Sequence, residues 1–324
     1  MLCCCLSHHI TESLADLIAC PAFSLLFRRE EYIELLKYAQ AKNVQIIPEF
    51  NMPAHARAAV MSMEARARNG DDTYRLTDPD DETYLLTVQF YDRTSIINPC
   101  LDSAVRFVEK LVTEVKLMHG EAGVPLDSYH FGGDEAKNIL LGAGYTSIPE
   151  ELKQQPFSKS PACQAKADSD PTFDVSKIAN YWAVVVNKIL ADNGIGEMIA
   201  WEDGLRGTTK DAYETSSVAI NFWQTLFWGG IDTLADIADD GLDIIMADPD
   251  YLYFDFPYEV HPEERGYYWG TRFNSVYKVF TFAPENLAQN AETSVDNNGN
   301  EMNIVTPNVG APKIRGMQGQ TWSE

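Results

Sequence analysis

The chain of 324 residues lacks several features that mark large classes of protein. Its apolar runs stay well short of the about 18 residues of a membrane-spanning helix, so we expect no membrane span. Basic residues are scarce: 25 Lys and Arg stand against 48 Asp and Glu, and the formal net charge of -23 disfavours nucleic acid or an acidic membrane surface as a partner. Because 45% of the residues are hydrophobic and 11% aromatic, the chain can bury a large core, which excludes the disordered class.

Cysteine is also scarce, and its distribution does not suggest a metal site. Cys3, Cys4, Cys5 and Cys20 form an N-terminal group without a CxxC pair or interleaved histidines, so we predict neither a metal nor a cofactor. The segment ending at Cys20 is similar to a lipoprotein cleavage box. Acidic residues and histidines precede it where a secretory signal needs an apolar stretch, so we predict no signal peptide and leave the compartment open.

The two remaining cysteines, Cys100 and Cys163, allow two interpretations. They could form a disulfide in an oxidising compartment, or they could remain free buried thiols.

The most informative stretch is HFGGDEAKN, residues 130–138, in which two glycines precede the adjacent acids Asp134 and Glu135. Hydrolysis of a bond between sugars needs one protonated carboxyl and a second group that stabilises the cationic sugar. Two like charges this close resist ionising together, so we expect the pKa of one carboxyl to be raised. A solvated acidic turn is the alternative, but this pair follows a short strand with aromatic residues, which other acidic pairs of the chain do not.

Helical and extended patterns alternate along the chain, which implies a parallel sheet. We expect helices at residues 29–43, 102–118, 176–192 and 231–239. We expect strands at residues 44–48, 127–131, 197–201, 218–223, 242–247 and 314–322, and polar loops at residues 67–95, 140–172 and 286–312.

Polar or aromatic residues recur where these strands end. They are Glu49, Asn51, Asp134, Glu135, Trp201, Asp203, Trp223, Tyr253, Asp255, Trp322 and Glu324. Each residue alone is weak evidence of a functional site, because a tryptophan at a strand end more often packs in a core and a lone aspartate more often caps a turn. Together they favour an α/β barrel, in which the loops after the strands build the active site at one rim.

Several segments, in this order, carry a resemblance to a known family. They are IIPEFNMPAHARAAV at residues 46–60, YHFGGDEAKN at 129–138, AWEDGL at 200–205, NFW at 221–223, DYLYFDFPYEV at 250–260, ERGYYWGTR at 264–272 and QTWSE at 320–324. The chain from about residue 29 onward resembles the family 20 β-N-acetylhexosaminidases, the bacterial chitobiases. The resemblance implies a (β/α)8 TIM-type barrel.

The resemblance also implies a mechanism and a set of site residues. In this family the acetamido oxygen of the substrate attacks the anomeric carbon, so no protein nucleophile is needed. Glu135 would be the general acid and then the base, while Asp134 would hold the acetamido N–H and stabilise the oxazolinium ion. The implied substrate-binding residues are Trp201, Trp223 and Trp322 around the acetamido group and the terminal sugar, Tyr253 on the acetamido carbonyl, Asp255 and Glu324 on hydroxyls, Trp269 on the next sugar and His55 near the acid. His55 could equally be a core histidine satisfied by hydrogen bonds.

Two departures from the family pattern bear on activity. Asn51 stands where the family usually has an aspartate; the amide keeps hydrogen bonds but removes a negative charge that could raise the pKa of His55. The chain also lacks the first two barrel strands, which carry a sugar-binding arginine and an HLTDD-type motif. We therefore expect about six of eight strands, with residues 1–28 a divergent segment, residues 29–324 a partial catalytic barrel, and a longer parent chain supplying the missing strands.

The predicted function is removal of terminal non-reducing β-linked N-acetylglucosamine from chitobiose and chitooligosaccharides, weak or absent in this chain alone. The family implies a periplasmic or secreted location. One rival is a catalytically silent N-acetylglucosamine binder, and another is a barrel hydrolase with a carboxylate nucleophile. The DxxDxDxE motif of the other chitinase class is absent, which weighs against the second rival.

Overall fold

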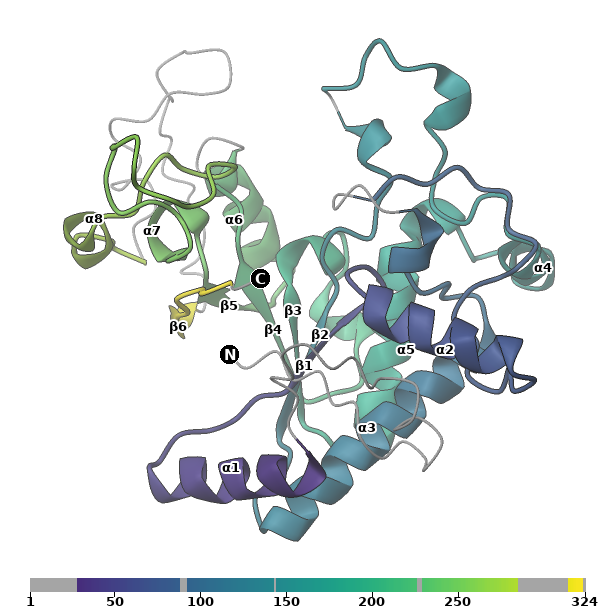
Figure 1. The fold of residues 1–324 in the computed structure, drawn as a ribbon, viewed down its shortest axis with the longest axis horizontal. Coiled ribbons are helices and arrows are strands. Elements are labelled where there is room, and N and C mark those ends of the chain that lie inside the picture. Colours follow the sequence, from purple (N-terminus) through teal and green to yellow (C-terminus); the bar gives the residue numbers. More distant parts are fainter. Residues whose placement is uncertain (1–27, 88–91, 143, 226–228, 285–313, 323–324) are drawn as a thin grey trace. The chain divides into compact units, whose positions relative to one another are not determined.

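The computed structural model describes residues 28–87, 92–142, 144–225, 229–284 and 314–322. Helices alternate with parallel strands along the chain, as predicted (Figure 1). The described residues divide into two compact units: the first runs to Leu205 and includes residues 213–216, and the second comprises residues 206–212 and the chain from Ser217 onward. None of the helices in the described ranges combines the length and the apolarity that crossing a membrane requires.

The first unit is built on three parallel strands in chain order. They are β1 (Glu49–Met52), β2 (Ser128–Gly132) and β3 (Glu197–Trp201). Glu49 is opposite His130, and His130 is opposite Ile199, so the register aligns the three strands. All of β2 is buried, which is typical of a parallel strand covered on both faces.

Helices connect these strands, as parallel pairing requires. They are α1 (Arg29–Ala41), α2 (Arg57–Arg68), α3 (Asp102–Ala122) and α5 (Ile178–Asp192). Helix α3 packs against α1 and α5 (Figure 1). The contact with α1 includes a hydrogen bond of 2.9 Å between the Tyr32 hydroxyl and His119 Nε2.

The long connection between β2 and α5 contains short helices. They are η2 (Ile139–Leu141), η3 (Glu150–Leu152), α4 (Pro161–Ser169) and η4 (Val175–Lys177), and η1 (Arg93–Ser95) precedes α3. A disulfide joins Cys100 to Cys163 across 63 residues, which decides between the two interpretations of these cysteines.

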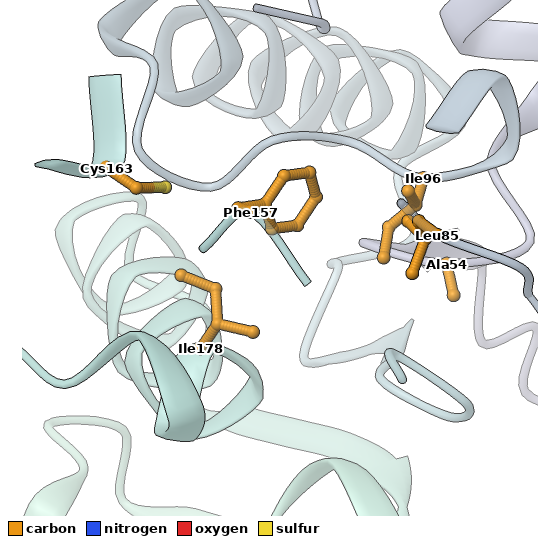
Figure 2. Close-up of a cluster of buried hydrophobic side chains, with 6 residues drawn as sticks. All are labelled: Ala54, Leu85, Ile96, Phe157, Cys163 and Ile178. Carbon is orange, nitrogen blue, oxygen red and sulfur yellow. The ribbon is translucent and has the colours of Figure 1, made fainter. Parts of the chain in front are cut away.

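A cluster of buried apolar side chains lies beside this disulfide. Figure 2 shows its members: Ala54, Leu85, Ile96, Phe157, Cys163 and Ile178. Ala136 and Cys100 pack against the cluster. Because Ala54 precedes His55 and Ala136 follows Glu135, the cluster fixes the backbone next to two predicted site residues.

The second unit also contains three parallel strands. They are β4 (Ser217–Phe222), β5 (Asp243–Met246) and β6 (Ile314–Met317), with β5 between the other two. Its helices are η6 (Lys210–Ala212), α6 (Gly230–Asp239), α7 (Pro249–Leu252) and α8 (Val276–Phe280).

Most predicted helices and strands are confirmed, with several corrections. The predicted loop at residues 140–172 contains helix α4, and the short helices α7 and α8 were not predicted. The first strand is Glu49–Met52 rather than residues 44–48, because the hydrogen-bonded register with β2 begins at Glu49 and Val44 is exposed. Helix α2 was not predicted, and only Val60 and Met63 of it are buried. The last strand ends at Met317 rather than at residue 322. The predicted loop at residues 286–312 lies outside the described residues.

Candidate active site

The turn after β2 positions the acidic pair. Gly132 and Gly133 have φ angles of +78° and +94°, which favour glycine. A Cβ atom on Gly132 would lie 1.8 Å from the Asn51 side-chain oxygen, so this position has no room for a larger residue. The two glycines let the backbone turn at the end of β2, directly before Asp134 and Glu135.

His55 and Glu135 both have a left-handed backbone, with φ angles of 53° and 57°. Non-glycine residues in this region carry strain that persists only where the surroundings enforce it, and such strain is frequent at functional sites. At Glu135 one enforcing contact is a hydrogen bond of 2.8 Å from its backbone N–H to Asp203 Oδ2. Asp203 is therefore a supporting residue that the predicted site set omitted.

One imidazole nitrogen contacts both acids. His55 Nε2 lies 3.1 Å from Asp134 Oδ2 and 3.1 Å from Glu135 Oε2. The side chains are half-buried: 28% of His55 is exposed, and 15% of each acid. These contacts place His55 beside the acids, as the resemblance implies, and the exposure of its side chain argues against a core histidine satisfied by hydrogen bonds.

The three side chains set one another's charge. Burial opposes a charge on His55, but the Asp134 and Glu135 carboxylates outweigh it and raise the pKa of His55 to about 10. Burial likewise opposes the charge on Asp134, but His55 and a hydrogen bond from Asn51 hold the pKa of Asp134 below its ordinary value. Asp134 is therefore not the member of the pair that holds a proton, and Asn51 keeps the hydrogen bond expected of an amide.

These contacts also bear on metal binding. Ligand atoms of His55, Asp134 and Glu135 lie within 4.8 Å of one another, which would suit a cation. A protonated His55 already supplies positive charge to both carboxylates at neutral pH.

A buried acid absent from the predicted set lies beside this group. Glu49 on β1 is 3% exposed and accepts a hydrogen bond of 3.0 Å from Trp201 Nε1. Burial, and next the charge of Asp134, raise the pKa of Glu49 to about 8. In the sequence, Glu49 stood out only as a polar residue at the end of a predicted strand, in the PEF segment. Its contact with Trp201 could not be predicted, because that contact depends on the register of three strands.

The second unit groups four other predicted residues in one aromatic cluster. Trp269 contacts Trp223 and Tyr253 edge-to-face, at ring-centroid distances of 5.7 Å and 5.3 Å, and Tyr253 lies 6.4 Å from Trp322. Phe256, which was not predicted, joins the cluster at 5.2 Å from Trp269. Trp269 and Trp322 are 40% and 41% exposed, so part of each residue is accessible to a ligand.

Asp255 lies in the same unit, half-buried, with its Oδ1 without a hydrogen-bond partner among the described residues. Burial raises its pKa. A buried carboxylate oxygen without a donor is costly unless a ligand supplies one. Glu324 lies outside the described residues.

Comparison with known proteins assigns the family. The catalytic-domain model of glycosyl hydrolase family 20 matches residues 11–324. The chain belongs to glycosyl hydrolase family 20. Among curated relatives, this family 20 chain is 46% identical to the N,N'-diacetylchitobiase of Vibrio harveyi over 92% of its own length and 36% of that protein. It is 39% identical to a beta-hexosaminidase of Vibrio vulnificus, over 92% of its own length and 34% of that protein. It thus spans about a third of the length of these two relatives.

Solved structures of the family share its fold. A family 20 exo-β-N-acetylglucosaminidase from Vibrio harveyi, in complex with N-acetylglucosamine, superposes with a TM-score of 0.66 at 22% identity, over 92% of this chain and 37% of that one. A Streptomyces coelicolor β-N-acetylhexosaminidase of family 20 gives a TM-score of 0.54 at 18% identity, over 92% of this chain and 45% of that one. The predicted fold class, part of a TIM-type barrel, is confirmed.

Proposed function

We propose that the protein removes terminal non-reducing β-linked N-acetylglucosamine from chitobiose and chitooligosaccharides, with retention of configuration. The observation that carries this proposal is the contact of one imidazole nitrogen with both Asp134 and Glu135 at 3.1 Å. The contact brings Glu135, the proposed acid, beside Asp134, whose carboxylate stays ionised. Membership of family 20 supports the proposal.

The bond between the sugars breaks in the first step. The acetamido oxygen of the substrate forms a bond to the anomeric carbon, and Glu135 gives its proton to the departing glycosidic oxygen. The 3.1 Å contact with His55 stabilises the carboxylate that remains. Asp134, whose pKa is held low, accepts the acetamido N–H and stabilises the positive oxazolinium ion.

Water completes the reaction in the second step. Glu135 takes a proton from the water that attacks the anomeric carbon, and the acetamido group is restored. No cofactor is required by this sequence of proton transfers. Both steps use carboxylates of the turn after β2, where two glycines and the Asp203 contact fix the backbone.

Aromatic rings would provide most of the sugar binding. Trp201, Trp223 and Trp322 are assigned to the terminal sugar, Trp269 to the next sugar and Tyr253 to the acetamido carbonyl. The apolar face of a pyranose stacks on an aromatic ring, and the exposure of Trp269 and Trp322 supports this role. Asp255 is assigned to a sugar hydroxyl because its Oδ1 is buried and lacks a donor among the described residues. Glu324 keeps the same assignment from the sequence alone.

The test pairs a turnover assay with a binding assay. We expect the wild-type chain to hydrolyse a chromogenic N-acetylglucosaminide weakly at most when alone and faster as part of its longer parent chain. Glu135→Gln should lose turnover in both forms while chitobiose still quenches its tryptophan fluorescence. Glu150→Gln, at an 84% exposed side chain, is the control for an acid-to-amide change. Unchanged turnover in Glu135→Gln rejects the acid assignment. Binding without turnover in the wild-type parent chain identifies a silent sugar binder, which is the rival interpretation.

We also propose that the protein works in an oxidising compartment, periplasmic or extracellular, as part of a longer chain. The disulfide between Cys100 and Cys163 supports the compartment, because reducing compartments keep most thiols free. The length of the curated relatives supports the longer chain. Alkylation of the protein in whole cells, followed by mass measurement of its peptides, tests the compartment. Of the six cysteines, Cys100 and Cys163 are expected to stay unmodified, and alkylation of both contradicts the proposal.

A further inference from the structure

Glu49 is a buried acid whose charge would interact with that of Asp134, and the proposed chemistry does not use it. It lies at the first position of β1 and is 3% exposed. Its Oε1 accepts the Trp201 Nε1–H at 3.0 Å from the last position of β3. The same Oε1 is 3.5 Å from His130 Nδ1 on β2. Glu49 thus connects β1, β2 and β3 by side-chain contacts, and β2 leads into the turn that carries the acids.

The His130 contact is not an ion pair. Burial lowers the pKa of His130 to about 3, so its imidazole is neutral. Its Nδ1 already accepts the backbone N–H of Gly132 at 3.0 Å, and its ring meets the Trp201 ring edge-to-face at 5.5 Å. His130 therefore supports Gly132 and Trp201 sterically, and it offers no charge to neutralise an ionised Glu49.

The other groups that face Glu49 favour its neutral form on balance. Asp134, in the turn after β2, repels a negative charge on Glu49, and His55, in the loop after β1, attracts one more weakly. Tyr129 on β2 is fully buried, and burial raises the pKa of its phenol, so it adds no positive charge. Together with burial, the Asp134 charge keeps the proton on Glu49 at neutral pH.

We propose that Glu49 is a positioning residue that holds the Trp201 indole at the end of β3 and holds it more tightly when it ionises. A carboxyl oxygen accepts the indole N–H in either form, but a carboxylate is the stronger acceptor. The Trp201 hydrogen bond accordingly favours the ionised form of Glu49, against burial and the charge of Asp134. Ionisation of Glu49 therefore strengthens the hydrogen bond that holds the Trp201 ring.

The proposal is tested without reference to catalysis. In the ¹⁵N-labelled chain, the indole N–H signal of Trp201, assigned with Trp201→Phe, should shift between pH 6 and 10 with a midpoint near pH 8, the pKa of Glu49. Trp182 is an internal control, because its indole is fully buried in α5 and its Nε1 has no hydrogen-bond partner among the described residues. Its signal should stay constant.

Glu49→Gln separates the proposal from a purely structural role. The amide oxygen can still accept the indole N–H but cannot ionise, so the Trp201 signal should persist and lose its pH dependence. A flat signal in the wild type, or the same midpoint in Glu49→Gln, overturns the proposal. The wild-type titration needs no variant, so a folding defect in Glu49→Gln leaves the test intact.

A kinetic measurement extends the inference and rests on the proposed function. The ratio of the KM of Glu49→Gln to that of the wild type, for an N-acetylglucosaminide, should rise by about tenfold between pH 6 and pH 9, roughly the difference between a charge-assisted and a neutral hydrogen bond. A ratio that stays constant with pH contradicts the role of Glu49. Absence of turnover in the longer parent chain would reject the proposed function alone, because the indole titration would still report on Glu49.

Discussion

At the scale of single residues, the charge of His55 organises the acidic pair. The sequence suggested that repulsion between Asp134 and Glu135 would push one pKa upward. In the structure His55 contacts both carboxylates, and its charge, with the Asn51 hydrogen bond, keeps Asp134 ionised. The high pKa of His55 arises without the aspartate that the family usually has at position 51, because Asp134 and Glu135 supply the negative charge.

The free energy of unfolding should depend on the charge of His55 as pH rises. The folded-state pKa of His55, about 10, lies above the ordinary value of 6.5. Its ion pairs therefore stabilise the fold fully below pH 6.5, and this stabilisation is lost as pH approaches 10. We expect the free energy of unfolding of the wild type, measured with urea, to fall across this window relative to that of His55→Gln.

The control for this comparison is His261→Gln, which changes an exposed loop histidine. Its stability should follow the wild-type curve at every pH. If the curves of His55→Gln and the wild type run parallel from pH 6.5 to 10, the ion pairs assigned to His55 are wrong.

The site was predictable from sequence where a contiguous motif carries it, and not where packing does. Asp134 and Glu135 follow from one string of residues, and His55 from a second. Glu49 and Asp203 were visible only as polar strand ends, because their roles depend on which side chain of a neighbouring strand or turn comes within hydrogen-bond distance. Such distances follow from strand register, which sequence spacing alone does not give.

At the scale of elements, the turn after β2 is the feature on which the site geometry depends. Gly132 and Gly133 both have positive φ angles. A Cβ atom on Gly132 would clash with Asn51, and one on Gly133 would lie 3.0 Å from the Phe131 ring. Steric constraints therefore explain why the motif has glycine at both positions.

Gly132→Ala should lower the free energy of unfolding by about 3 kcal/mol or more, because it adds a left-handed alanine and a steric clash with Asn51. Gly123→Ala is the matched control: Gly123 also has a positive φ angle, of 71°, but a Cβ there would have no neighbour within 4 Å. We expect a loss of about 1 kcal/mol for Gly123→Ala from the backbone alone. If both variants lose the same free energy of unfolding in urea denaturation, the clash between Asn51 and the methyl group that Gly132→Ala adds is relieved at no cost, which contradicts the steric argument.

The elements themselves were predicted best where periodicity is strong. The helix at residues 29–43 and the strand at 197–201 correspond closely to α1 and β3. The first strand was placed too early because its apolar lead-in resembles a strand, whereas pairing with β2 starts at Glu49. Helix α2 escaped prediction because only two of its side chains are buried, which leaves a weak periodic signal.

At the scale of the whole molecule, the predicted site residues come from two compact units. The acids, His55, Asn51 and Trp201 belong to the first unit, and the other described aromatic residues and Asp255 belong to the second. The long connection after β2 in the first unit is tied by the disulfide, and its apolar side chains pack in one cluster with Ala54 (Figure 2). Ala136 packs against this cluster, so the chain neighbours of His55 and Glu135 are both held there.

Removing the disulfide should therefore weaken the first unit. Cys100 and Cys163 are 63 residues apart, and closing a loop of that size is worth about 4 kcal/mol in the chain-entropy model. We expect a double Cys100→Ser, Cys163→Ser variant to lose stability of this order in urea denaturation. A reductant should destabilise the wild type and leave the double variant unchanged. An equal response of both proteins to the reductant would contradict the assignment.

The division of labour between Glu135 and Asp134 is tested most directly by changing the leaving group of the substrate. Steady-state rates should be measured for wild type, Glu135→Gln and Asp134→Asn on chitobiose and on an N-acetylglucosaminide whose acidic phenol leaves without protonation. We predict that Glu135→Gln loses about 10²- to 10⁴-fold on chitobiose and far less on the activated substrate, whereas Asp134→Asn loses on both, because acetamido participation is needed for each. Equal losses of Glu135→Gln on the two substrates would contradict its role as the acid.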